Sequence, residues 1–205
     1  RDIVSITTPP ATHREYVEAC AAASTRLIVC EKPLALTSTD ALAMVEACRA
    51  SGTILLVNHG RRFHPLLRHA RDEVRAGRIG KPLSAVATCS GGLWHGQSHM
   101  VDLLRFFLGD VGWVVGHKRG PCSEDSREDG YDAVLWFRDG ARGTLHAADI
   151  ARYVAFDLNI LGETGALRVD AYGCRVLWAT ADDSYPLASG YRWLVEDGAP
   201  GVVPW

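Results

Sequence analysis

The stretch that decides the fold runs from Leu27 to Pro33 and reads LIVCEKP. Four apolar residues end at a charged pair and a proline, which is typical of a buried β-strand followed by a turn. Similar apolar runs occur earlier and later in the chain, at Ile3–Thr7 and at Thr53–Val57. Because each run is continuous rather than alternating, we expect a parallel sheet with helices on both faces.

Two helical segments separate these three strands. The first is expected over residues 12–23, with Thr12 as its N-cap and with Tyr16, Val17 and Cys20 on one apolar face. The second is expected to begin at a cap formed by Ser38 or Thr39 and to end at the glycine at position 52. Strand–helix–strand–helix–strand is half of a doubly wound α/β sheet, so we predict a partial Rossmann-type domain over residues 1–58.

Residues 59–205 follow a different pattern. Helices are expected over 65–76 and 99–108, and period-2 alternation predicts several strands, with a hairpin turn at Asp139-Gly140. The expected strands cover residues 83–89, 112–118, 131–138, 142–148, 154–161, 166–169 and 175–179. The prediction is therefore a second, α+β domain with a mostly antiparallel sheet, continuing beyond the last residue of this chain.

Composition excludes several classes of protein. The 205 residues carry a net charge of −2, so a nucleic-acid partner is not expected. The apolar runs are too short to span a bilayer, so a membrane location is not expected either. Six cysteines without a C-x-x-C pair are typical of a reducing compartment, and we predict a cytoplasmic protein. Because the chain opens at Arg1 as though within a strand, we expect it to be a piece of a longer protein.

The strand ends predict where a ligand binds. The three expected parallel strands end at Thr7-Thr8-Pro9, Glu31-Lys32-Pro33 and Asn58-His59-Gly60, and the carboxyl ends of parallel strands lie at one edge of a sheet. Desolvation at a strand end would favour a neutral Lys32 and suit it to proton transfer. The alternative is a surface turn in which Lys32 pairs with Glu31.

A second group of polar residues lies at His95, Ser98, His99 and Asp102. With Ser98 as N-cap, His99 would stand in the first helical turn, where the helix dipole keeps its ring neutral, and Asp102 would orient it. The alternative is a pair of structural histidines. The same cap would leave His95 outside the helix, so we predict no metal site.

Two other motifs have weaker implications. The pair Arg61-Arg62 is suited to hold a phosphate or carboxylate between two guanidinium groups, unless it is simply a solvated basic face. Glycines at 162 and 165 superficially resemble a phosphate-binding loop. No helix pattern follows them, and we predict a hairpin turn instead.

Taken in order, these motifs resemble the glucose–fructose oxidoreductase/inositol dehydrogenase/MocA (Gfo/Idh/MocA) family of NAD(P)-dependent oxidoreductases. The resemblance covers about the first 110 residues. It rests on Thr8-Pro9-Pro10 with His13, Glu31-Lys32-Pro33, Arg61-Arg62-Phe63 with Pro65, the stretch GRIGKP at 77–82, and His99 with Asp102.

The resemblance implies roles for these residues. In such a protein the catalytic residues would be Lys32 and His99. NAD or NADP would lie against Thr7, Thr8, Pro9, His13, Glu31, Lys32 and Pro33, and the Lys32–Pro33 peptide would be cis. Substrate contacts would come from Arg62, Trp94 and His95. The large sheet would form the interface of a homodimer or homotetramer.

The activity implied is reversible hydride transfer between the cofactor and a secondary alcohol of a sugar or cyclitol. His99 would accept the hydroxyl proton, while Lys32 would position the hydroxyl and stabilise charge on its oxygen. Three departures set this sequence apart: no G-x-G-x-x-G is present, His95 stands where many members have Asp, and Gly60 replaces a frequent Asn. The alternatives are a non-catalytic nucleotide- or sugar-binding sensor of the same fold and an inactive fragment.

Overall fold

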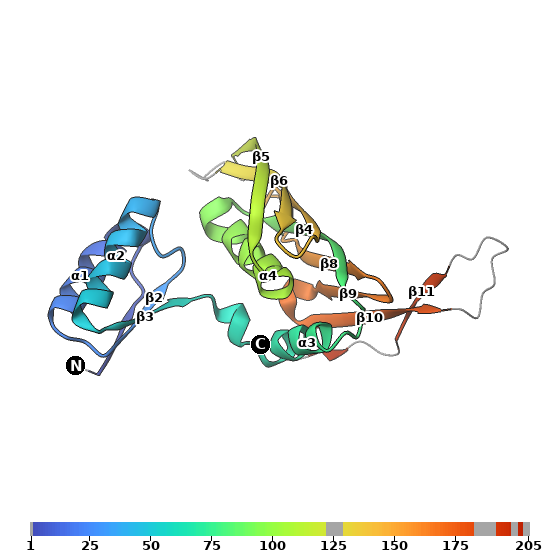
Figure 1. Ribbon diagram of the computed structural model, residues 1–205. Helices are drawn as coiled ribbons and strands as arrows, with labels where there is room; N and C mark the ends of the chain where they lie inside the picture. The colour runs from blue at the N-terminus through green and yellow to red at the C-terminus, as the bar shows by residue number, and fades with distance from the viewer. Residues whose placement is uncertain (1, 122–128, 183–191, 198–200, 203–205) are drawn as a thin grey trace. The chain divides into compact units, whose positions relative to one another are not determined.

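The computed structural model describes residues 2–121, 129–182, 192–197 and 201–202. The chain divides into two compact parts, which we call unit 1 (Arg1–Gly60) and unit 2 (Arg61–Trp205) and describe separately. Figure 1 shows the two units with their elements labelled. No helix in the described ranges is both long and apolar enough to span a bilayer.

Unit 1 alternates strands and helices, as the sequence predicts. Its three strands are parallel and lie in the order β1-β2-β3. The elements are β1 (Ile3–Ile6), the 3-10 turn η1 (Pro10–Thr12), α1 (His13–Ala22), β2 (Leu27–Glu31), α2 (Ser38–Ser51) and β3 (Ile54–Asn58).

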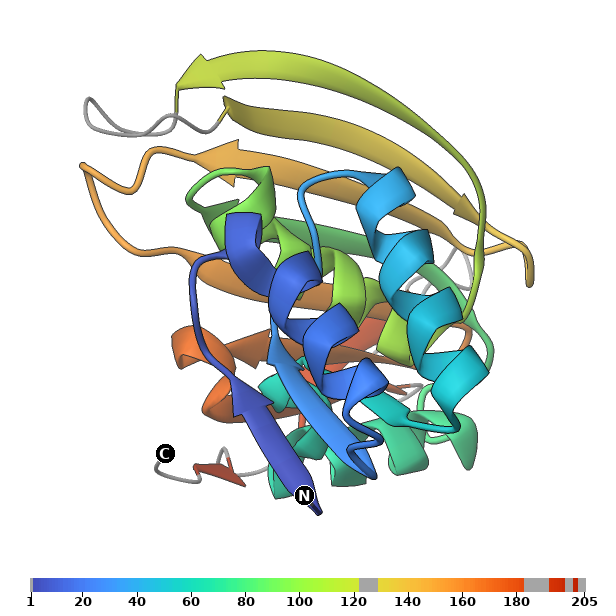
Figure 2. The same ribbon diagram turned by 90° about the vertical axis from the view of Figure 1, so that its left-hand side faces the viewer.

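Both helices of unit 1 pack on the same face of its sheet (Figure 2). The expectation of helices on both faces is wrong within this unit. Two successive right-handed crossovers that step in the same direction across a sheet place their helices on one side. The core between the layers contains Val17, Ile28 and Met44, whereas Tyr16, expected on the apolar face of α1, is 45% exposed.

The helix caps differ from those expected. Thr37, not Ser38 or Thr39, caps α2: its backbone is extended and its hydroxyl accepts a hydrogen bond from the Asp40 amide at 3.1 Å. Thr12 makes no capping bond, because its hydroxyl is engaged by Thr8 and the Pro9 carbonyl, each at 2.9 Å. A 3-10 turn therefore leads into α1 in place of a side-chain cap.

The cysteines that the structure describes are free thiols, and Cys122 lies outside the described residues. Cys30 is buried in β2, and burial raises the pKa of its thiol to about 11. Burial also raises the pKa of the Cys48 thiol in α2. A thiol in such surroundings is a packing group rather than a nucleophile.

Unit 2 is the α+β part that the sequence predicts. Its two long helices are α3 (Pro65–Arg75) and α4 (Ser98–Leu108), and shorter helical turns are η2 (Gly60–Phe63), η3 (Leu93–Gln97) and η4 (Ala171–Gly173). Its strands are β4 (Pro82–Ser90), β5 (Val111–Pro121), β6 (Asp129–Phe137), β7 (Arg142–Ala148), β8 (Phe156–Gly162), β9 (Gly165–Asp170), β10 (Arg175–Asp182), β11 (Trp193–Glu196) and β12 (Gly201–Val202).

One large sheet organises unit 2, in the order β11-β10-β9-β8-β4-β7-β6-β5, with β12 paired to β10. Its strand pairs in the described residues are antiparallel except β4 with β7, which confirms the mostly antiparallel prediction. Helices α3 and α4 contribute Leu67, Leu103 and Leu104 to the core, against alternate residues of β4 such as Ala87. The core therefore lies between these helices and the sheet.

Two predicted turns are confirmed. Asp139 and Gly140 lie in the turn between the antiparallel strands β6 and β7. Gly162 and Gly165 end β8 and begin β9, which are also antiparallel, so this glycine pair forms a hairpin and not a phosphate loop.

The close approach at Gly162 generates a first prediction. A Cβ atom built there would lie 2.1 Å from the carbonyl oxygen of Ile79, whereas one at Gly112 in β5 would meet nothing nearer than 3.4 Å. We expect Gly162→Ala to lower the free energy of unfolding by about 2 kcal/mol, because the backbone must shift. Gly112→Ala is the matched strand control, and equal denaturant midpoints for the two variants would contradict the prediction.

Candidate functional site

The carboxyl ends of the three parallel strands lie along one edge of unit 1. Cys30 pairs with Val57 and Glu31 with Asn58 in the sheet register, so the ends of β2 and β3 are level. The turn that carries Lys32 begins at this edge. At the same edge, Thr7 and Pro9 are exposed after β1. The predicted convergence of these segments is therefore confirmed within unit 1.

Glu31 anchors the turn that carries Lys32. Its carboxylate accepts a 2.6 Å hydrogen bond from the side-chain amide of Asn58 and a 3.3 Å bond from the backbone N–H of Lys32. The Lys32–Pro33 peptide is cis, as predicted, and Lys32 itself is partly exposed. Glu31 thus fixes the backbone from which the lysine side chain projects.

His13 lies beneath this edge and is fully buried. Its Nε2 is 2.8 Å from the Thr8 carbonyl oxygen, and its Nδ1 is 3.1 Å from the carbonyl oxygens of both Pro33 and Leu34. The ring therefore joins the loop after β1 to the loop after β2. Direct contact between His13 and a cofactor remains a prediction, since in this structure backbone groups surround the ring.

The helix that carries His99 begins earlier than the sequence indicates. The π-helical turn η3 leads directly into α4, and the expected N-cap Ser98 has helical backbone angles. The Ser98 hydroxyl donates to the carbonyls of Trp94 and His95 at 3.0 and 3.3 Å, so the capping prediction is wrong. As a consequence His95 lies inside the helical segment, and His99 no longer stands at a free helix N-terminus.

Gln97 holds this segment to the sheet. Its side chain is fully buried; its amide donates to the Tyr131 carbonyl at 2.6 Å, and its oxygen accepts from the Tyr131 amide at 3.0 Å. Gly96 packs so closely on β4 that a Cβ there would fall 2.0 Å from the Ser90 carbonyl oxygen. Sequence reasoning missed Gln97, because nothing local distinguishes a buried glutamine from a solvated one.

The two arginines after β3 have separate partners. Arg62 donates from Nε to both carboxylate oxygens of Asp102 at 2.8 Å, whereas Arg61 is buried, with its guanidinium over the ring of Phe156. The expectation of a shared anion fork is wrong. In a 3-10 turn successive side chains point about 120° apart, so Arg61 and Arg62 diverge.

The predicted site residues thus form two groups. In unit 1, His13 bonds to the carbonyls of Thr8 and Pro33, and Glu31 bonds separately to Asn58 and to the Lys32 amide. In unit 2, Trp94, His95 and His99 lie along one helical segment, with Trp94 and His95 exposed and His99 partly exposed. The meeting of Lys32 with His99 stays a prediction. Among the described residues, no three His, Cys, Asp or Glu side chains cluster closely enough to hold a metal ion.

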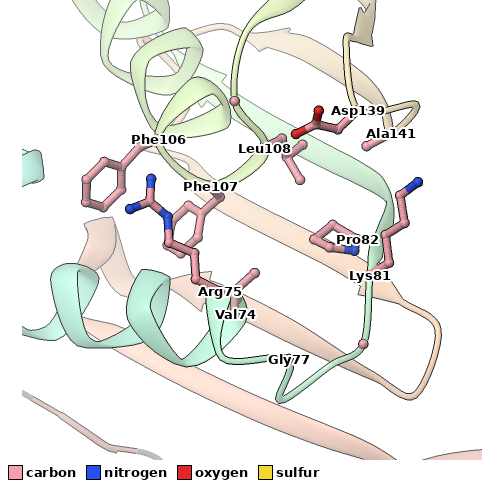
Figure 3. A pocket seen from close by; sticks show the side chains of 12 residues that line it. Val74, Arg75, Gly77, Lys81, Pro82, Phe106, Phe107, Leu108, Asp139 and Ala141 are labelled. Carbon is pink, nitrogen blue, oxygen red and sulfur yellow. The ribbon is translucent and has the colours of Figure 1, made fainter.

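A cavity of about 660 Å³ lies in unit 2, away from these residues. Figure 3 shows Phe107 and Leu108 from the end of α4, Pro82 from the start of β4 and Asp139 from the β6–β7 turn around it. His99 and Leu108 are nine positions apart on α4, a rise of about 13 Å, so this cavity is not the predicted site.

Two family models match the chain. One, described as an oxidoreductase family with an NAD-binding Rossmann fold, matches residues 1–59, and the other, a GFO/IDH/MocA C-terminal domain, matches residues 87–168. The chain belongs to the Gfo/Idh/MocA family.

The curated relatives of this chain include proteins named as sugar and cyclitol dehydrogenases. The chain is 35% identical over 192 residues to D-apiose dehydrogenase of Paraburkholderia graminis, an alignment covering 83% of this chain and 51% of that protein. It is 31% identical to scyllo-inositol 2-dehydrogenase (NAD(+)) of Bacillus subtilis, covering 74% and 50%. The chain thus spans about half the length of the curated relatives it matches.

Solved structures of this family share the fold. A levoglucosan dehydrogenase in complex with NADH and levoglucosan matches with a TM-score of 0.80 at 24% identity, covering 97% of this chain and 61% of that one. An inositol dehydrogenase homolog from Azotobacter vinelandii matches with a TM-score of 0.76 at 20% identity, covering 99% and 58%. These solved structures therefore share the fold of this chain.

The His13 network generates a second prediction. We expect His13→Ala to lower the free energy of unfolding by about 3 kcal/mol, because buried carbonyl groups lose their hydrogen-bond donor. Arg14→Ala is the control on the same helix: its ion pairs with Glu18 and Asp40 are exposed and contribute little to stability. Denaturant unfolding measures both variants, and equal losses would refute the role of the ring.

Proposed function

We propose that this chain carries the hydride-transfer end of an NAD(P)-dependent oxidoreductase acting on a secondary alcohol of a sugar, cyclitol or related polyol. The observation that carries the proposal is the Lys32 turn at the carboxyl edge of a parallel sheet, held by Glu31 and by the His13 network. Ligands of open α/β sheets bind at this edge. Relatives named as sugar and inositol dehydrogenases support the polyol substrate.

The residues present fit the nicotinamide end of the dinucleotide. Thr7 and Pro9 are exposed, and Thr8, Glu31, Lys32 and Pro33 are partly exposed, so the edge offers hydroxyl, carboxylate and backbone groups to an amide-bearing ring. When bound, the cofactor would supply the nicotinamide C4 that takes up or gives back a hydride. A G-x-G-x-x-G for the pyrophosphate does not occur in these 205 residues, so the fit concerns this end alone.

In this proposal Lys32 and His99 divide the work on the substrate hydroxyl. The Lys32 side chain donates to the hydroxyl oxygen and stabilises the negative charge that develops there. The His99 imidazole accepts the hydroxyl proton as the C–H bond breaks. Trp94 and His95, exposed on the turn before α4, contact the rest of the substrate.

We also propose that the protein is a homodimer or homotetramer. The face of the large sheet opposite α3 and α4 presents exposed apolar side chains, among them Val86, Val115 and Leu161. Trp113 stacks on Trp136 on neighbouring strands at 4.0 Å between ring centroids. An apolar face of this kind is typical of an interface between subunits.

Replacement of Lys32 tests the catalytic proposal. In the full-length protein we expect Lys32→Ala to lower turnover by about 10² or more, because the developing charge loses its partner. Reduced-nicotinamide fluorescence, followed with a panel of sugars and cyclitols, measures the rate. Lys81→Ala is the control, since Lys81 is exposed in a turn of unit 2.

Two outcomes would contradict this proposal in different ways. Turnover near the wild-type rate in Lys32→Ala would show that the lysine has been assigned the wrong role. A wild-type protein that binds dinucleotide or sugar without turnover on any polyol would instead support the sensor of the same fold.

A further inference from the structure

The contact between Arg62 and Asp102 differs from the other ion pairs of α4 in its geometry. The Arg62 Nε lies 2.8 Å from both carboxylate oxygens, and its Nη2 lies 3.4 Å from the Asp102 backbone carbonyl. The guanidinium is therefore bonded to both the side chain and the backbone of the helix. A cation held in this way resists rotation of the helix as well as displacement of its side chain.

Arg62 lies over the helix face that carries His99. Residues 99, 102 and 106 follow the i, i+3, i+7 spacing of a single face of an α-helix. The guanidinium contacts two of these three positions, Asp102 by hydrogen bonds and Phe106 through its ring, at 5.3 Å from the ring centroid. The pair thus acts on the face from which the candidate base projects, one turn away.

The backbone that carries Arg62 is itself fixed. The neighbouring Arg61 is only 7% exposed, with its guanidinium 4.1 Å from the ring centroid of Phe156 and 4.8 Å from that of Tyr172. A desolvated cation between two rings is held more firmly than one in water. Because Arg61 and Arg62 share the short turn η2, the first anchors the turn to β8 and η4 while the second reaches α4.

The side chains of Arg62 and Asp102 are less exposed than those of an ordinary surface ion pair. The Asp102 side chain is 12% exposed and that of Arg62 36%, compared with 69% and 51% for Asp110 and Arg105, which pair at 2.6 Å at the other end of the same helix. Exposed pairs contribute little to stability. Removing one partner of a largely buried pair leaves a charge that the surroundings do not compensate.

We propose that Arg62 and Asp102 form a positioning pair that holds α4 so that His99 points at the reacting hydroxyl. This inference rests on the proposed function, in which His99 is the base. It replaces the substrate contact expected of Arg62: the guanidinium binds the helix that carries the base, and its effect on the reaction passes through the placement of His99.

The test compares, in the full-length protein, two ion pairs that each have one member on α4. We expect Arg62→Met and Asp102→Asn each to lower kcat by about 10- to 100-fold, because a misplaced base forfeits the orientation that catalysis needs, with KM for the polyol little changed. The double variant should lose no more than the worse single variant, since the two residues act as one unit. Arg105→Met and Asp110→Asn are the matched controls and should keep kcat near the wild-type value.

Other results would overturn the inference. A raised KM with unchanged kcat in Arg62→Met, together with a normal Asp102→Asn, would make Arg62 a substrate contact. Losses of kcat that add in the double variant would show two independent roles. A lowered thermal midpoint without any loss of kcat would leave the pair purely structural. If Asp102→Asn does not fold, Arg62→Lys takes its place. The inference then requires a lowered kcat with KM little changed in Arg62→Lys.

Reference variants separate this inference from the proposed function. If Lys32→Ala and His99→Ala turn over polyols normally, the proposed function fails, and the positioning role fails with it. If both are impaired while Arg62→Met and Asp102→Asn are not, the proposed function stands and the positioning role alone is wrong.

Discussion

The buried ring of His13 is the interaction on which the candidate site of unit 1 depends. The loops after β1 and β2 have no regular structure of their own at this edge, and the imidazole bonds to a carbonyl of each. Only a ring nitrogen that carries a proton can donate to the carbonyl facing it, so the tautomer decides which loop the ring binds. The buried ring of His13 therefore positions the exposed loop residues that would meet a ligand.

In unit 2 the backbone that carries the candidate base is also held by a buried polar side chain, here a glutamine. The turn that leads to His99 is bonded to β6 through the buried amide of Gln97, which uses both its donor and its acceptor on the backbone of Tyr131. A buried polar group whose hydrogen bonds are satisfied rigidifies its surroundings, whereas an unsatisfied one would be costly. In both units, a buried polar side chain fixes the backbone next to exposed residues that would meet the cofactor or substrate.

Periodicity was sufficient to predict the order and type of the main helices and strands up to residue 179, but not the strands β11 and β12 that follow. The three apolar runs became parallel strands, and the alternating segments from residue 83 to 179 became the strands of the large sheet. Chain direction then brings the Thr8 and Lys32 loops to one edge. These features follow from local patterns, because hydrophobic spacing and turn residues are read from neighbours along the chain.

The errors occurred where distant residues decide the local structure. Ser98 looked like a helix cap, but the close packing of Gly96 on Ser90 and the bonds from Gln97 to β6 extend the helix backwards past it. Tyr16 is exposed, because the face of α1 that packs in the core is the one carrying His13, Val17 and Ala21. Such outcomes depend on tertiary contacts that a single sequence does not reveal.

The pair Arg61-Arg62 shows how far the meaning of a motif depends on its backbone. On a loop that turns both side chains to one side, two guanidinium groups suit a single anion; on a 3-10 turn they point about 120° apart. One is then buried against aromatic rings and the other reaches an aspartate on the helix of the candidate base. The same two residues that suggest a ligand site in sequence therefore join three elements of unit 2 in the fold, and the chemistry is left to the residues they hold in place.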